Sequence, residues 1–344
     1  MERVIASLCC TVGCIIFSMA VVLVVPSGPE ASDALALDRS DEVFNVLPDE
    51  KYGPLVRVAL VQLEMLLPQD PQRHIADAFA AIDEAGQRGV DLIVLPEGVN
   101  IGSGGNIPYR DVAERADSRM MKRVSYKAAE YNCHILFPFI ELRGKESYNS
   151  AALFDRSGSC LGVYRKVHEP RCVVLGEGVF MGDNFPVFDT DIGRIGILIC
   201  YDAITPEPAL IYGLEGVDLI VFPHMIQPLE NEHFHITTRA RAIDASLHIA
   251  AAGWARPFEE AGGRLSATCF VDWEGKVLAQ GSMLDPGIVY CEARIGRPRI
   301  TEWLGVVEKA EWRKVLWGER RPHLYGRLTK GNAEWRAWCP SDKR

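Results

Sequence analysis

The stretch Ile195-Gly-Ile-Leu-Ile-Cys-Tyr-Asp202 places a cysteine directly after a run of apolar residues. Such a run predicts a buried β-strand, and Cys200 stands where that strand gives way to a loop. Two other stretches share this arrangement: Leu92-Ile-Val-Leu-Pro-Glu97 ends on a carboxylate, and Val163-Tyr-Arg-Lys-Val-His168 contains a lysine. Rigid strands fix the side chains at their ends, while the loops leave room for a substrate. We therefore expect the three strand ends to build one site.

From Leu55 onward, short apolar runs alternate with amphipathic stretches, which is the pattern of helices that cover sheets. The apolar runs predict strands over residues 56–63, 91–95, 134–142, 148–155, 194–200, 218–222, 247–252, 267–272 and 287–293. Helical spacing of apolar residues predicts helices over residues 71–88, 110–131 and 231–245. No internal repeat interrupts the pattern, so we expect one α/β domain.

Cys200, Lys166 and Glu97 are residue types that can act together in nucleophilic catalysis. A single cysteine after an apolar run is more often a buried, inert thiol. A nucleophilic cysteine needs a base that removes its proton and a cation that favours the thiolate. Glu97 can supply the base, and the ammonium group of Lys166 can favour the thiolate and stabilise an oxyanion. The combination predicts a catalytic site.

These motifs resemble those of the carbon-nitrogen hydrolase family, also called the nitrilase superfamily. The similarity includes Leu95-Pro96-Glu97, Tyr164-Arg165-Lys166-Val167-His168 and the stretch from Pro186 to Asp202, and it extends from Val56 to Leu328. The order and spacing of the motifs make the resemblance specific. It implies a four-layer α-β-β-α sandwich, with two sheets face to face and helices outside, and association into a homodimer or a larger homo-oligomer.

Carried over residue by residue, the resemblance implies Glu97 as general base, Lys166 as oxyanion stabiliser and Cys200 as nucleophile. The backbone N–H of Tyr201 would join the oxyanion hole. In this reaction the cysteine attacks an amide carbonyl, Glu97 passes the proton to the departing nitrogen, and water hydrolyses the resulting thioester. No metal and no organic cofactor is required.

Members of the family often carry a second glutamate between the lysine and the cysteine, which orients the site. Glu177 is the best match in this sequence. The stretch Glu177-Gly-Val-Phe-Met-Gly182-Asp is shorter than the usual family pattern and lacks the common proline before Gly182. Glu169 therefore stays an alternative for this role.

The residues after the cysteine favour a small-molecule amide or a ureido (carbamoyl) compound as substrate. Nitrile-hydrolysing members of the superfamily commonly carry Cys-Trp-Glu, whereas this chain has Cys200-Tyr201-Asp202 and resembles the amidase and carbamoylase branches. A nitrile substrate is one alternative, and a noncatalytic binding or scaffolding protein with the same fold is another. Loops such as residues 206–214 and 225–232 are expected to set the specificity.

Composition and charge exclude several other classes of function. With 48% hydrophobic and 24% charged residues, the 344-residue chain falls in the ordinary globular range. Its formal net charge of -9 leaves no basic surface for nucleic acid. The stretch Glu232-His233-Phe-His235 offers potential metal ligands, but positions two apart on the predicted helix point to different faces, so we expect no metal site.

The N-terminal region contains an uncharged run from Val4 to Val25, long enough for a helix to cross a bilayer. We expect this N-terminal hydrophobic helix to lie in a signal anchor or signal peptide, residues 1–29, which the acidic linker of residues 30–54 follows. The protein would then be membrane-anchored or exported, with its catalytic domain, residues 55–328, outside the cytoplasm. Residues 329–344 would form a C-terminal arm that contains tryptophan and arginine.

Overall fold

The computed structural model of the chain describes residues 55–66, 70–102, 107–170, 178–225, 231–255, 268–282, 284–296, 298–303 and 307–330. The expected N-terminal hydrophobic helix and the acidic linker lie outside these residues, as do Glu177 and all but the first two residues of the C-terminal arm. Within the described ranges, no helix is both long enough and apolar enough to cross a membrane.

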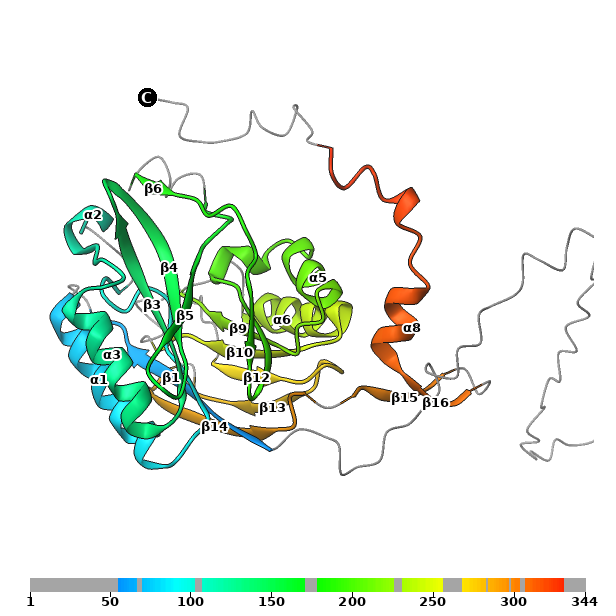
Figure 1. The fold of residues 1–344 in the computed structure, drawn as a ribbon, viewed down its shortest axis with the longest axis horizontal. Coiled ribbons are helices and arrows are strands. Elements are labelled where there is room, and N and C mark those ends of the chain that lie inside the picture. The colour runs from blue at the N-terminus through cyan, green and yellow to red at the C-terminus, as the bar shows by residue number, and fades with distance from the viewer. Residues whose placement is uncertain are drawn as a thin grey trace, which may run out of the picture. The chain divides into compact units, whose positions relative to one another are not determined.

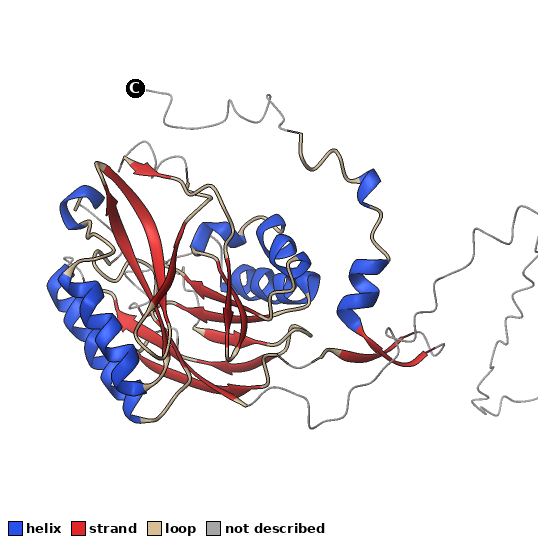
Figure 2. Ribbon diagram, in the orientation of Figure 1, coloured by secondary structure: helices blue, strands red, loops and turns tan. Residues whose placement is uncertain are grey.

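Two β-sheets lie face to face, with helices on the outer side of each (Figures 1 and 2). The first sheet has the strand order β11-β1-β2-β3-β4-β5, with β14 also paired to β1 and β6 to β4. Its strands are β1 (Val56–Glu64), β2 (Leu92–Val94), β3 (His134–Arg143), β4 (Glu146–Phe154), β5 (Cys160–Arg165), β6 (Val179–Phe180), β11 (Trp254–Ala255) and β14 (Gly287–Ala293). The parallel strands β1, β2 and β3 form its centre.

The second sheet has the strand order β13-β12-β10-β9-β8-β7. Its strands are β7 (Val187–Thr190), β8 (Gly193–Ile197), β9 (Leu219–Pro223), β10 (His248–Ala252), β12 (Cys269–Val271) and β13 (Val277–Gln280). Strands β8, β9 and β10 run parallel at its centre. A parallel centre in both sheets brings the carboxyl ends of several strands to common edges, which is where α/β folds build their sites.

Helices cover the outer faces of both sheets. Helices α1 (Pro71–Gln87) and α3 (Arg119–Tyr131) pack on the first sheet, and α5 (Glu207–Leu214) and α6 (Asn231–Ala245) pack on the second. Short additional elements are α2 (Tyr109–Val112), the 3-10 helices η3 (Cys200–Ala203) and η4 (Pro322–Leu324), the hairpin of β15 (Ile300–Trp303) and β16 (Val307–Glu311), and α8 (Trp312–Gly318). The α-β-β-α layering expected from the resemblance is confirmed.

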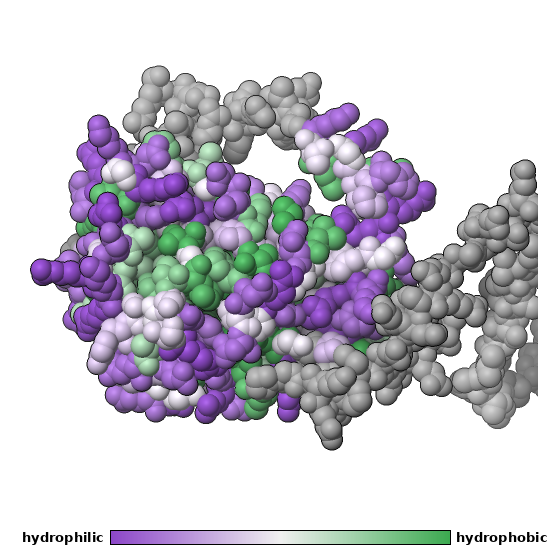
Figure 3. Space-filling view, in the orientation of Figure 1, coloured by the Kyte–Doolittle hydropathy of each residue, from purple (hydrophilic) through white to green (hydrophobic). Residues whose placement is uncertain are grey.

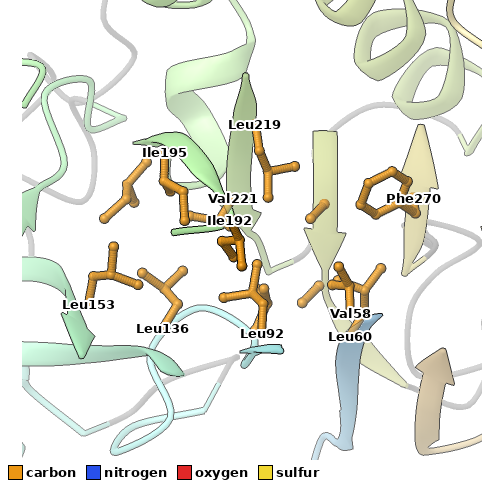
Figure 4. Close-up of a cluster of buried hydrophobic side chains, with 14 of the residues drawn as sticks. Val58, Leu60, Leu92, Leu136, Leu153, Ile192, Ile195, Leu219, Val221 and Phe270 are labelled. Carbon is orange, nitrogen blue, oxygen red and sulfur yellow. The ribbon is translucent and has the colours of Figure 1, made fainter. Parts of the chain in front are cut away.

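The core follows from the two-residue period of a strand that is buried on both faces. Along β1, Val58 and Leu60 point into the layer between the sheets, while Ala59 and Val61 pack beneath the outer helices. Figure 4 shows side chains of the two sheets meeting in the inner layer. Leu92 of the first sheet lies on one side of this layer, and side chains of the second sheet lie on the other. These strands therefore appear in the sequence as continuous apolar runs.

The helix expected over residues 110–131 is wrong, because the structure has two helices there. Helix α2 ends at Val112, and Ala113 has extended backbone angles. Glu114 then pairs with β3, since its N–H donates to the carbonyl of Ile140 and its carbonyl accepts from Leu142. Ser118 begins α3 by accepting a hydrogen bond from the backbone N–H of Met121. Hydrogen bonds with the neighbouring strand therefore replace helical ones over this stretch.

The loop expected over residues 206–214 is also wrong, since most of it forms helix α5. Pro208 lies in the first turn of this helix, where its missing N–H breaks no intrahelical hydrogen bond. Tyr212 is fully buried, and its hydroxyl donates to the carbonyl of Ile197 over 2.9 Å. This helix therefore supports the strand that leads to Cys200.

A buried arginine joins the C-terminal part of the described chain to the second sheet. The side chain of Arg299 is 0% exposed, and its guanidinium lies 3.4 Å from Oδ1 of Asp218. Arg313 donates to the same oxygen over 3.0 Å and also contacts Glu311. A buried carboxylate without partners costs free energy of folding. The two arginines therefore stabilise the charge of Asp218 and hold this residue just before β9.

We predict that Gly196→Ala destabilises the protein by about 1–3 kcal/mol, the usual cost of overpacking a core. A Cβ at position 196 would lie 2.9 Å from the ring of Tyr212, which is buried and hydrogen-bonded to β8. Gly287→Ala in β14 is the matched control, because a Cβ there meets no atom within 4 Å. Urea unfolding measures both free energies, and equal effects would contradict the packing argument.

Candidate functional site

Cys200 stands at a sharp change of backbone direction. Strand β8 ends at Ile197, and Cys200 begins the 3-10 helix η3 with a φ of +47°. A residue with a Cβ adopts this left-handed conformation at a cost of roughly 1–2 kcal/mol. Strain of this kind persists only where the surroundings enforce it. The turn holds the thiol just beyond the strand, with the residue 8% exposed.

Asp202 is the group that enforces this turn. Its Oδ2 accepts hydrogen bonds from the Ile199 backbone N–H at 3.0 Å and from the Tyr164 hydroxyl at 2.7 Å. Its Oδ1 accepts from the backbone N–H of His168 at 2.8 Å and lies 3.0 Å from the imidazole of that residue. The carboxylate is fully buried, so each of these hydrogen bonds is in a low-dielectric interior. Through Tyr164 on β5, Asp202 also ties the first sheet to the end of β8.

The His168 imidazole is held by the same carboxylate. Its hydrogen bond to Asp202 raises the pKa of His168, although burial acts in the opposite direction. The ring also stacks on Phe185 at 6.2 Å between centroids. These contacts give His168 a role in fixing the segment that carries Lys166.

Lys166, Glu97 and Glu169 form a buried cluster of charges. The Nζ atom of Lys166 lies 2.9 Å from Oε1 of Glu97 and 3.2 Å from Oε2 of Glu169. The three side chains are at most 4% exposed. Burial alone would lower the pKa of Lys166, but the charges of Glu97 and Glu169 outweigh it and raise that pKa well above its usual value. Lys166 is therefore an ammonium at neutral pH.

Two further contacts position Glu97, and sequence reasoning missed both. Asn149 of β4 donates to Oε1 of Glu97 over 2.8 Å, and Trp254 of β11 donates from its indole to the Glu97 carbonyl over 2.9 Å. Lys166 and Asn149 thus share one carboxylate oxygen. The available signals were weak: Asn149 is a polar residue inside an otherwise apolar strand, and Trp254 follows the end of the predicted strand 247–252.

The Cys200 thiol lies against this cluster. It hydrogen-bonds with Glu97 and with the backbone of Met225. Burial and the negative charge of Glu97 raise the pKa of Cys200, while Lys166 opposes them. The resting cysteine is therefore a neutral thiol with a carboxylate ready to accept its proton. A thiol, a base and a fixed ammonium in contact can perform nucleophilic acyl transfer.

The structure brings together the three residues that the sequence singled out. Glu97 follows β2, Lys166 follows β5 and Cys200 follows β8. Of the two candidates for a second glutamate, Glu169 contacts Lys166, whereas Glu177 lies outside the described residues. Tyr201 follows Cys200 in η3, and its backbone N–H stays the predicted member of an oxyanion hole. Within the described ranges, no group of three His, Cys, Asp or Glu side chains is arranged to hold a metal ion.

Comparison with known proteins places this geometry in a family. The family model of the carbon-nitrogen hydrolases matches residues 57–303. The chain therefore belongs to the carbon-nitrogen hydrolase family, and it is a hydrolase acting on carbon-nitrogen bonds other than peptide bonds. The expectation drawn from the three motifs is confirmed.

Curated relatives match most of the chain. The omega-amidase NIT2 of Homo sapiens is 29% identical over 245 residues, which cover 69% of this chain and 87% of that protein. A citrullinase of Francisella tularensis is 26% identical over 297 residues, which cover 80% and 98%.

Solved structures share the fold. The carbon-nitrogen hydrolase of Helicobacter pylori superposes with a TM-score of 0.66 at 22% identity, covering 80% of this chain and 99% of that one. An amidase from Nesterenkonia sp. gives a TM-score of 0.63 at 21% identity, covering 79% and 96%. A structure of an amidase from Nesterenkonia sp. AN1 carries the acetamide moiety of fluoroacetamide added covalently at its active-site cysteine.

We predict that Asn149→Ala lowers kcat by about tenfold or more, on the scale seen when a group that orients a reactive residue is removed. The Glu97 carboxylate would lose one of the two donors that fix its Oε1. Steady-state kinetics and a thermal melt of the same preparation measure the effect. A folded variant with the kcat of the wild-type protein would show that Asn149 does not orient Glu97.

Proposed function

We propose that the protein hydrolyses an amide or a ureido compound through a thioester on Cys200, with Glu97 as general base and Lys166 as oxyanion stabiliser. The observation that carries the proposal is the buried Lys166–Glu97 ion pair of 2.9 Å, hydrogen-bonded to a thiol on a strained turn. Burying a lysine with two glutamates costs solvation energy that apolar residues would not. Perturbed charges gathered beside a nucleophile are typical of an active site.

The reaction follows from the positions of these groups. Glu97 takes the thiol proton as the Cys200 sulfur attacks the substrate carbonyl carbon, and the oxyanion that forms is stabilised by Lys166 and the Tyr201 backbone N–H. Glu97 then gives the proton to the leaving nitrogen, the carbon-nitrogen bond breaks, and ammonia or an amine departs. Glu97 next removes a proton from water, which attacks the thioester and releases the acid and the thiol.

The substrate class rests on two kinds of support. Relatives named omega-amidase and citrullinase support amide and ureido substrates. Asp202, at the position where nitrile-hydrolysing members commonly carry glutamate, is buried and occupied by hydrogen bonds with Ile199, Tyr164 and His168. It is therefore a structural group of the turn and does not face a substrate as a free acid.

Release of ammonia by the purified protein tests this proposal. Simple amides, N-carbamoyl amino acids and nitriles are incubated at equal concentration, and ammonia is measured against time. We expect release from amides or ureido compounds. Release from nitriles alone would show that the substrate class is nitriles and not amides or ureido compounds. Absence of release from all three would contradict the proposed function.

We predict that Cys200→Ala lowers kcat by a factor of at least about 10⁴, the scale of losing a catalytic nucleophile. The change removes little volume, so the fold should persist. Cys269→Ala is the matched control, because Cys269 is also buried but lies on β12 in the core beneath α6. Turnover by a folded Cys200→Ala variant at the rate of this control would refute the thioester mechanism.

We predict that Lys166→Met lowers kcat by about 10²-fold or more, the effect of losing one oxyanion donor. Methionine keeps most of the side-chain length but carries no charge. Lys127→Met is the control, because Lys127 also forms two ion pairs, with Asp83 and Glu130 at 2.7 Å each, but lies on α3. If Lys166→Met changed KM while kcat stayed constant, Lys166 would be a substrate-binding residue.

Association into a homodimer or a larger homo-oligomer is part of this proposal. Large apolar side chains of α5 and α6 stay exposed in the single chain, namely Ile211 (38%), Leu214 (46%), Ile236 (54%) and Ile243 (48%). Hydrophobic side chains also gather in the middle of the face shown in Figure 3. Such surfaces are typical of protein contacts. The membrane-anchored or exported location stays a prediction from residues 4–25.

A further inference from the structure

Arg241 joins helix α6 to the turn that carries the nucleophile, and the mechanism above leaves it unused. Its Nε donates to the carbonyl of Ala203 over 3.2 Å, and its Nη2 donates to the carbonyl of Ile204 over 2.9 Å. Ala203 is the last residue of η3, which begins at Cys200, and Ile204 follows it. The side chain of Arg241 is 13% exposed, so both hydrogen bonds are largely shielded from water.

We propose that Arg241 is a positioning residue that fixes the carboxyl end of η3 and so holds the backbone N–H of Tyr201 where the oxyanion forms. The inference rests on the function proposed above. Arg241 does not touch the substrate in this scheme, and it acts through the two carbonyls at the end of η3.

Helix α6 gives Arg241 a rigid support. Ala242 and Ala245 of this helix are fully buried in the core against the second sheet. Asp244 lies 3.8 Å from the guanidinium of Arg241. Burial lowers the pKa of Arg241, and the charges of Asp244 and Glu207 act in the opposite direction. An arginine stays charged at neutral pH, so it donates from every N–H of its guanidinium.

The need for a support at this end follows from the shortness of η3. The backbone N–H of Asp202 donates to the carbonyl of Ile199 over 3.0 Å, and that of Ile204 donates to the carbonyl of Tyr201 over 3.1 Å. The last carbonyls of a helix find no partner within it. The carboxylate of Asp202 holds the backbone before Cys200, so the far end of the turn needs another group. A planar guanidinium that donates to two successive carbonyls fixes their positions and their directions.

The position of η3 matters for catalysis because the N–H of Tyr201 belongs to it. A donor stabilises an oxyanion only when it is already aimed at the place where the negative charge forms. This N–H follows Cys200, whose φ of +47° is a strained conformation that lasts only while both sides of the turn are held. Release of the carboxyl end would let the peptide group rotate. The loss would then affect the transition state more than the bound substrate, whose carbonyl oxygen carries no full charge.

We predict that Arg241→Met lowers kcat by about tenfold or more and leaves KM within about twofold, because misplacement of a catalytic group by about 1 Å can cost 10²-fold. Methionine keeps an apolar stem but donates no hydrogen bond. Arg241→Lys keeps the charge without the planar fork, so it should recover part of kcat. Arg239→Met is the matched control, because Arg239 lies on the same helix but donates to the carbonyl of Gly275, between β12 and β13, over 2.7 Å. This control should keep the wild-type kcat.

Hydrogen exchange measured by mass spectrometry follows η3 without any turnover. The backbone N–H groups of Asp202 and Ile204 should exchange about tenfold faster or more in Arg241→Met than in the wild-type protein and in Arg239→Met, because the turn opens more often. All measurements are made below the melting temperatures of the variants. Faster exchange throughout the chain would show a general loss of stability and would overturn the positioning role in favour of a structural one.

The kinetic constants can overturn the role of Arg241 in three further ways. A folded Arg241→Met variant with the wild-type kcat would show that Arg241 only stabilises the fold. A rise in KM at constant kcat would make Arg241 a substrate-binding residue. A fall in kcat with unchanged exchange over residues 200–204 would show that Arg241 does not act through η3.

The two proposals fail separately in this design. If the wild-type protein turns over and Arg241→Met keeps both its kcat and its exchange, the role of Arg241 is refuted and the proposed function stands. If the wild-type protein hydrolyses none of the substrates, the proposed function is refuted, and exchange decides the remaining question. Faster exchange confined to residues 200–204 of Arg241→Met then supports the hold of Arg241 on η3, and identical exchange refutes it.

Discussion

The site depends on one buried carboxylate, that of Asp202. It receives hydrogen bonds from the backbone after β8, from Tyr164 on β5 and from the segment that carries Lys166. These groups belong to two different sheets, so a single side chain fixes how the nucleophile of one sheet meets the ammonium of the other. The left-handed conformation of Cys200 is stable because these hydrogen bonds hold the backbone on either side of it. The same hydrogen bonds therefore hold the strained backbone of Cys200 and align its thiol with the ammonium group of Lys166.

The strands were predictable because they are buried on both faces and so consist of continuous apolar runs, as in β2 and β9. The break between α2 and α3 was not predictable from the sequence. It arises from backbone hydrogen bonds that Glu114 makes with β3, and this strand lies outside the local sequence pattern. Helix α5 was missed for a related reason: its Pro and Gly residues are typical of loops, and burial of Tyr212 against the second sheet overrides that local preference.

The reactive residues of the site were predictable from their chemistry and from their places at strand ends. Their supporting partners were not. Asn149 reaches Glu97 from β4, and Trp254 reaches it across 157 positions of sequence, so neither lies near a motif. The choice between Glu169 and Glu177 shows the limit from another direction, because the resemblance favoured Glu177, which lies outside the described residues, whereas the structure shows Glu169 in contact with Lys166. Three-dimensional neighbours of this kind carry no periodic signal.

The pairing of Asp218 with Arg299 places a condition on how the chain folds during synthesis. The two residues are 81 positions apart, and β14 must reach β1, more than two hundred residues away, to complete the first sheet. Until the ribosome has released both partners, the centre of the second sheet contains a carboxylate without its ion-pair partner and β1 has an unpaired edge. Contacts of such long range close slowly. The amino-terminal half of this enzyme therefore cannot complete its packing until the carboxyl-terminal half has been synthesised. A nascent chain that stalls before residue 287 is open to aggregation and to binding by chaperones.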